Sequence, residues 1–133
     1  FNAPNTNGMS SVLADKADWR DCINKSEIEG LDFITAGPIP PNPSELLGSQ
    51  RMRDLLEELK KRYDNIIIDT PPVVAVTDAV ILSTLVDAYI LVARANTTHM
   101  EIVSKSRESI DRVGGRMLGI VLNDFDVSNN YGS

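Results

Sequence analysis

Short apolar runs alternate with longer amphipathic stretches along this chain of 133 residues. The runs at 65–69, 88–93 and 118–122 lack the polar alternation of a half-exposed strand, which is typical of strands buried on both faces. A fourth strand is predicted at 31–37, where the sequence ends in Gly-Pro. Strands of this kind, separated by helices, favour a parallel sheet covered on both faces.

Helical periodicity lies between these runs. Leu and Met residues recur at steps of three and four after Pro43, with charged residues on the other faces, so one helix reaching about residue 62 is expected. Asn42 is its expected N-cap, and Glu45 is placed to complete a capping box. Further short helices are predicted at 10–13, 19–24 and 77–85.

The last predicted helix, at 98–113, begins at Thr98, which has capping-box spacing to Glu101, and stops at a Gly-Gly pair. The predicted fold class is therefore α/β, a three-layer, mostly parallel sheet with helices on both faces. The length is that of about one domain, so we expect residues 1–133 to form a single domain with a polar tail at 124–133.

Composition narrows the function classes. The formal net charge of -6 argues against a general affinity for nucleic acid, although a local basic patch is compatible with it. A single cysteine forms no internal disulfide, and with one histidine it argues against a transition-metal site. The N-terminal residues have no signal-peptide pattern, and no apolar run is long enough to cross a bilayer as one helix, so a cytoplasmic protein is expected.

The stretch Asn-Ile-Ile-Ile-Asp-Thr-Pro-Pro at 65–72 carries the candidate chemistry. Ligands of doubly wound sheets collect beyond the carboxyl ends of the strands, where Asp69 and Asn123 are both expected. A carboxylate after an apolar strand is the pattern of the magnesium-binding aspartate of nucleoside-triphosphate enzymes. The simpler alternative, that Asp69 only terminates a strand, is equally compatible with the sequence Ile-Ile-Ile-Asp at 66–69 when it is taken by itself.

Longer motifs carry a resemblance to a known family. The sequence "IIIDTPP", preceded by "GPIPPNPSELLGSQRM", resembles the catalytic domain of bacterial tyrosine kinases of the capsule and exopolysaccharide type. These are P-loop NTPases near the septum-site and plasmid-partition ATPases. The resemblance extends from Gly8 to Asn123, and its proline-rich block is the most specific part, because the related ATPases share "DTPP" without it.

The resemblance implies roles for single residues. Asp69 is implied as the Walker B aspartate that holds Mg²⁺, with Thr70 in the turn after it, and Asn123 as a residue beside the adenine of ATP. Arg94 is placed to approach the nucleotide. Tyr131 stands where such kinases begin a C-terminal cluster of tyrosines, which they phosphorylate in one another. The structural alternatives are a turn-forming Asn123, an exposed strand-end Arg94 and a solvated Tyr131.

Two family motifs are absent from the sequence. It contains neither a Gly-x-x-x-x-Gly-Lys-Ser/Thr phosphate loop nor an apolar strand ending in Asp-x-Asp. Because both precede the matching region in the family, we expect this chain to be the C-terminal portion of a P-loop kinase domain, incomplete and inactive by itself.

The intact protein is implied to regulate synthesis or export of an extracellular or capsular polysaccharide. The implied partners are neighbouring kinase subunits and a membrane polysaccharide co-polymerase domain or adaptor, at the inner face of the cell membrane. Two other functions stay open: an ATPase switch of the septum-site and partition type that drives dimerisation, and a non-catalytic scaffold with a kinase-like shape.

Overall fold

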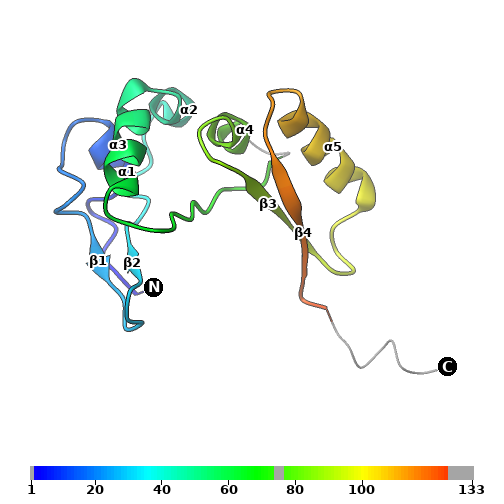
Figure 1. The fold of residues 1–133 in the computed structure, drawn as a ribbon, viewed down its shortest axis with the longest axis horizontal. Helices are drawn as coiled ribbons and strands as arrows, with labels where there is room; N and C mark the ends of the chain where they lie inside the picture. Colours follow the sequence, from blue (N-terminus) through cyan, green and yellow to red (C-terminus); the bar gives the residue numbers. More distant parts are fainter. Residues whose placement is uncertain (1, 74–76, 126–133) are drawn as a thin grey trace. The chain divides into compact units, whose positions relative to one another are not determined.

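The computed structural model describes residues 2–73 and 77–125 and divides the chain into two compact units, Phe1–Asp69 and Thr70–Ser133. Each unit combines helices with a two-stranded sheet (Figure 1). The first contains α1 (Met9–Leu13), β1 (Asn24–Lys25), β2 (Asp32–Phe33), α2 (Pro43–Leu47) and α3 (Gln50–Lys60). The second contains α4 (Asp78–Ser83), β3 (Tyr89–Arg94), α5 (Met100–Asp111) and β4 (Met117–Asn123).

Helix α3 supplies half of the buried apolar residues of the first unit. The buried face that its periodicity predicts consists of Met52, Leu55, Leu56 and Leu59. Val12, Leu13 and Trp19 are buried as well. Each fully buried side chain of this size contributes about 1.5–3 kcal/mol, so this apolar face outweighs any single polar contact in the unit.

The N-terminal segment lies against the residues that lead into the proline-rich block. Backbone N–H groups of Met9 and Ser10 donate to the carbonyls of Thr35 and Ala36 at 2.8 and 2.9 Å. A Cβ atom at Gly8 would overlap the Thr35 carbonyl and the backbone of the following turn. Only glycine therefore permits this close backbone approach.

The second unit is built on a parallel strand pair. Strands β3 and β4 run side by side with α5 alongside them (Figure 1), and Arg94 is paired with Asn123 at the carboxyl end. Val103, Ser106 and Ile110 form the buried face of α5. The predicted strands at 88–93 and 118–122 are confirmed to within one residue, and Gly114, at φ 79°, ends the helical segment as expected.

The prediction of a strand at 65–69 is wrong. These residues belong to no strand, and the Ile67 side chain is 91% exposed. A strand needs a neighbour that accepts and donates its backbone hydrogen bonds. The apolar run predicts burial but cannot specify that neighbour, and no described segment of the chain provides one.

The single helix predicted after Pro43 is also wrong, because Gly48 and Ser49 divide it into α2 and α3. The Ser49 hydroxyl accepts the N–H of Met52 at 3.3 Å and begins the second helix as its N-cap. Asn42 holds the N-cap position of α2 without a side-chain cap; its amide donates to Glu45 instead, at 3.1 Å.

Three smaller expectations need correction. The short helix predicted around 19–24 is a turn, and the strand at 31–37 shrinks to β2, which pairs antiparallel with β1. Helix α5 takes His99 rather than Thr98 as its N-cap residue, because the Thr98 hydroxyl accepts the Arg94 N–H at 2.9 Å. Among the described residues, no helix has the length and apolar character that crossing a membrane requires.

The buried hydroxyl of Tyr89 leads to a prediction about stability. The Tyr89 phenol oxygen is buried and has no hydrogen-bond partner among the described residues, and burial raises the pKa of this phenol. An unsatisfied buried group costs about 1–3 kcal/mol, so Tyr89→Phe should raise the free energy of unfolding by about 1 kcal/mol in urea titrations. Tyr63→Phe is the matched control, since it removes a hydroxyl that does make a hydrogen bond and should lower stability. A less stable Tyr89→Phe protein would contradict the assignment.

Candidate nucleotide site

The carboxyl ends of β3 and β4 bring together two of the predicted site residues. Arg94 and Asn123 are cross-strand partners, and the Ala95 N–H donates to the Asn123 carbonyl at 2.8 Å. Both side chains are exposed. The Asn123 amide, which is donor and acceptor at once, and the Arg94 guanidinium therefore face solvent at one edge of the sheet.

The turn after β3 is closed on the backbone of Arg94. The Arg94 N–H donates to the Thr98 hydroxyl at 2.9 Å, and the Arg94 carbonyl accepts the N–H of Thr98, also at 2.9 Å. Asn96 in this turn and Asp124 after β4 both have φ 57°, in the left-handed region. Such conformations cluster at ligand sites, since the surrounding structure has to hold them there.

The charges at this edge are loosely paired. The Arg94 Nε and the Asp124 carboxylate are 3.7 Å apart, with 63% and 72% of their side chains exposed. An exposed pair of this kind contributes at most about 1 kcal/mol. The Arg94 guanidinium can therefore turn to another anion at little cost.

Asp69 and Thr70 lie at the junction of the two units. Asp69 is the last residue of the first and Thr70 the first of the second, and both are exposed. Neither takes part in the hydrogen bonds around Arg94 and Asn123. In the described ranges, no three Asp, Glu, His or Cys side chains are grouped closely enough to hold a metal ion. Tyr131 falls outside the described residues.

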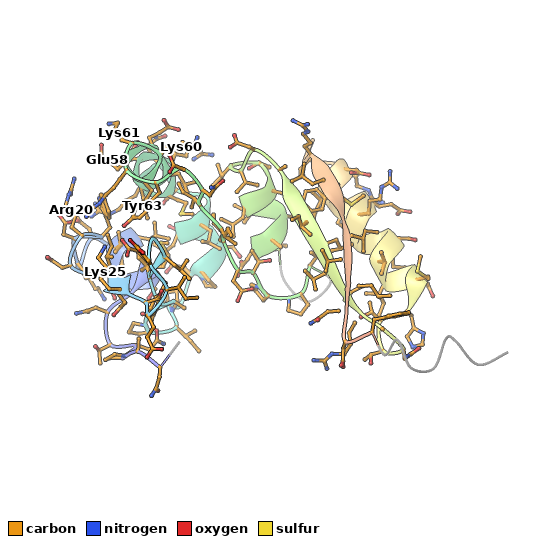
Figure 2. The ribbon with its side chains drawn as sticks, turned by 60° about the horizontal axis from the view of Figure 1, so that its bottom comes forward. Arg20, Lys25, Glu58, Lys60, Lys61 and Tyr63 are labelled. Carbon is orange, nitrogen blue, oxygen red and sulfur yellow. The ribbon has the colours of Figure 1, made fainter. Side chains whose placement is uncertain are left out.

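A second polar cluster lies in the first unit, and the sequence analysis did not predict it. The Tyr63 hydroxyl donates to the Asp32 Oδ2 at 2.7 Å, and the Lys25 Nζ contacts the same oxygen at 2.7 Å. Arg20, Lys25 and Tyr63 are labelled in Figure 2 within this unit. Since 31 residues separate Asp32 from Tyr63, no local spacing rule could have joined them.

Comparison with known proteins identifies the family. The family model described as AAA domain matches residues 2–119. Curated relatives include a putative tyrosine-protein kinase CapB from Staphylococcus aureus, 38% identical over 98% of this chain, and the tyrosine-protein kinase YwqD from Bacillus subtilis, 39% identical over 96%. The chain belongs to the AAA-domain family, and these two relatives are named as tyrosine-protein kinases.

Solved structures agree with this assignment and with the predicted P-loop-like fold class. The chimerical protein CapA2B2 matches 94% of this chain with a TM-score of 0.89 and 42% identity, over 55% of its own chain. The kinase domain of Escherichia coli tyrosine kinase ETK matches 98% with a TM-score of 0.88 and 38% identity, over 51% of its own chain. This chain spans 57% of CapB and 54% of YwqD, about half of each relative.

The Asp32–Tyr63 contact predicts a pH dependence with two limbs. Hydrogen bonds from Lys25 and Tyr63 hold the pKa of Asp32 below its ordinary value of about 4, so its stabilisation is present above that pH and lost as the pH falls through the lowered pKa. The hydrogen bond to Asp32 raises the pKa of Tyr63 above about 10. Its stabilisation is present below pH 10 and lost as the pH rises through the raised pKa.

We therefore expect the urea concentration at the unfolding midpoint of the first unit to decrease when the pH is lowered below about 4. It should decrease again when the pH is raised above about 10. Fluorescence of Trp19, the single tryptophan of the chain and a buried residue of this unit, measures the transition. Tyr63→Phe should flatten the alkaline limb. An alkaline limb that is unchanged in this variant would show that Tyr63 does not carry it.

Proposed function

We propose that this chain is part of an ATP-dependent protein tyrosine kinase that phosphorylates tyrosines of neighbouring copies and regulates polysaccharide synthesis or export. The observation that carries the proposal is the match of nearly the whole chain, at 38% identity, to the kinase domain of E. coli ETK. A relative from Klebsiella pneumoniae, 39% identical over 99% of this chain, is named a putative tyrosine-protein kinase in the cps region.

Three predicted site residues, taken one at a time, have side chains that suit Mg-ATP chemically. The exposed amide of Asn123 offers the donor and acceptor that an adenine edge requires. The Arg94 guanidinium, held only by an exposed ion pair, suits a phosphate group. The exposed carboxylate of Asp69 is a hard oxygen ligand of the kind Mg²⁺ prefers, and the exposed Thr70 follows it in the sequence.

In this proposal Mg²⁺ supplies charge neutralisation of the phosphates, and the residues of this chain position the nucleotide. Asp69 would hold the metal, and Asn123 would contact the adenine base. Tyr131 of a neighbouring copy is the phosphoacceptor. The Gly-rich phosphate cradle is missing from this sequence, so the chain alone is not expected to turn over ATP.

The proposal extends to partners and cellular place. Neighbouring kinase subunits would form a homo-oligomer in which one copy offers its tyrosine to the next. A membrane polysaccharide co-polymerase domain, fused or on a partner chain, would hold the cytoplasmic kinase at the inner face of the cell membrane. The net charge of -6 supports a protein partner rather than nucleic acid.

The missing phosphate loop favours one rival, a non-catalytic scaffold that retains the kinase shape. The residues encoded upstream of Phe1 in the same reading frame decide between them. A Gly-x-x-x-x-Gly-Lys-Ser/Thr motif followed by an Asp-x-Asp strand is expected there. An uninterrupted reading frame that lacks both motifs would favour the scaffold.

Replacing the proposed metal aspartate tests the function directly. In the polypeptide that the complete reading frame encodes, Asp69→Ala should reduce Mg-ATP-dependent phosphotyrosine formation about 100-fold, because a metal-ordering ligand contributes several kcal/mol to the transition state. Asp87→Ala is the matched control, since Asp87 is an exposed carboxylate that precedes the amino end of β3.

Phosphotyrosine mass spectrometry and ADP release are measured together on these variants. Equal phosphotyrosine formation in Asp69→Ala and the control would exclude Asp69 as the metal ligand. ADP release without phosphotyrosine would replace the kinase by the ATPase switch, and neither product would leave the scaffold.

A further inference from the structure

Tyr63 has the arrangement that a phosphoacceptor needs. Its hydroxyl donates to the Asp32 Oδ2 at 2.7 Å, within the range over which a general base accepts a proton. In protein kinases an aspartate in this relation to the substrate hydroxyl accepts its proton during phosphoryl transfer. Here the carboxylate belongs to the same chain as the hydroxyl, so the acceptor carries its own base.

The other tyrosines do not share this arrangement. The sequence has three tyrosines. The Tyr89 hydroxyl is buried and unpaired among the described residues, which closes it to an incoming phosphate, and Tyr131 lies outside those residues. Tyr63 is half-buried and lies just beyond the end of α3, on a segment that another molecule can approach.

Two cations lie close to Tyr63 and its hydrogen-bond partner. The Lys25 Nζ lies 2.7 Å from the Asp32 oxygen that accepts the Tyr63 hydroxyl, and its side chain is 75% exposed. The Arg62 guanidinium lies 5.9 Å from the centre of the Tyr63 ring. Lys25 belongs to β1, and both Lys25 and Tyr63 are labelled in Figure 2. A phosphate on Tyr63 would therefore have two positive charges near it, which is the environment that phosphorylated side chains require.

We propose that Tyr63 is a second phosphoacceptor of this chain, with Asp32 as its base and Lys25 and Arg62 as the counter-charges of the product. The step rests on the proposed function, because an active copy of the kinase supplies the ATP. A bond forms between the Tyr63 oxygen and the γ-phosphorus, the bond from that phosphorus to the bridging oxygen of ADP breaks, and the hydroxyl proton passes to Asp32 and then to water.

The product would change the link between α3 and the β1–β2 hairpin. A phosphate adds a charge of about -1.5 to -2 beside the Asp32 carboxylate and removes the hydrogen-bond donor that joins the two residues. Like charges repel, so Lys25 should move from Asp32 to the phosphate. The segment that leads from Tyr63 to Asp69 would then lose this hydrogen bond to the hairpin, which would link the modification to the proposed metal ligand.

The test uses this chain as the substrate of a kinase added in trans. We expect the kinase domain of E. coli ETK, with Mg-ATP, to phosphorylate Tyr63 of the folded chain, as measured by time-resolved mass spectrometry of the peptide that contains it. Tyr89 is the internal control and should stay unmodified. Asp32→Asn should slow phosphorylation of Tyr63 about 100-fold, the lower end of what a positioned base contributes, and leave the rate at Tyr131 unchanged.

Each outcome decides the inference. Phosphate on Tyr131 with none on Tyr63 overturns this inference and leaves the proposed function intact, whereas no phosphotyrosine anywhere on the chain counts against both. Equal or faster modification of Tyr63 in Asp32→Asn overturns the role of the base, since a tyrosine exposed by unfolding would behave in that way. Lys25→Gln keeps the base and removes one counter-charge, so it should slow the reaction less than Asp32→Asn does, and Trp19 fluorescence verifies that each variant is folded.

Discussion

The register of β3 against β4 determines the geometry of the candidate nucleotide site. Tyr89 is paired with Met117 but Ile90 with Gly119, so one extra residue enters β4 at this point. Without that bulge, Arg94 would lie opposite Leu122 instead of Asn123. A shift of one residue sends every following side chain to the other face of the sheet. The irregularity at the start of the pair therefore places a guanidinium and an amide together at its far end.

Much of the second unit could be predicted because its information is local. The apolar runs of β3 and β4, the Gly-Gly stop after α5 and the position of Asn123 at a strand end all depend on residues adjacent in sequence. Rules based on neighbouring residues could not predict the bulge in β4, because a bulge exists only once two strands are paired. The Thr98 hydroxyl shows the same limit: its spacing to Glu101 predicted a helix cap, but this hydroxyl accepts the backbone N–H of Arg94, which lies outside the helix.

The first unit shows two features that hydrophobic periodicity could not predict: the absence of a described partner strand for residues 66–68 and the contact of Asp32 with Tyr63. Ile66 to Ile68 have the composition of a central strand, yet the structure gives them no partner strand among the described residues. The apolar run predicts both burial of its side chains and pairing of its backbone, and the described structure provides neither, since Ile67 is 91% exposed. The same limit hid the contact of Asp32 with Tyr63, where the two residues meet only after α3 and the hairpin have packed.

Several cations of the first unit form ion pairs with carboxylates, which bears on the basic patch that composition left open. Lys60 lies 3.0 Å from Glu57, Lys61 2.9 Å from Glu58, and Arg20 3.2 Å from Glu58. These pairs are exposed and individually weak, and each of them places a carboxylate beside the cation. A single phosphate attached covalently at Tyr63 is different, because it needs only the one or two cations already beside it. The arrangement of charge therefore favours a local covalent anion over docking of an extended one.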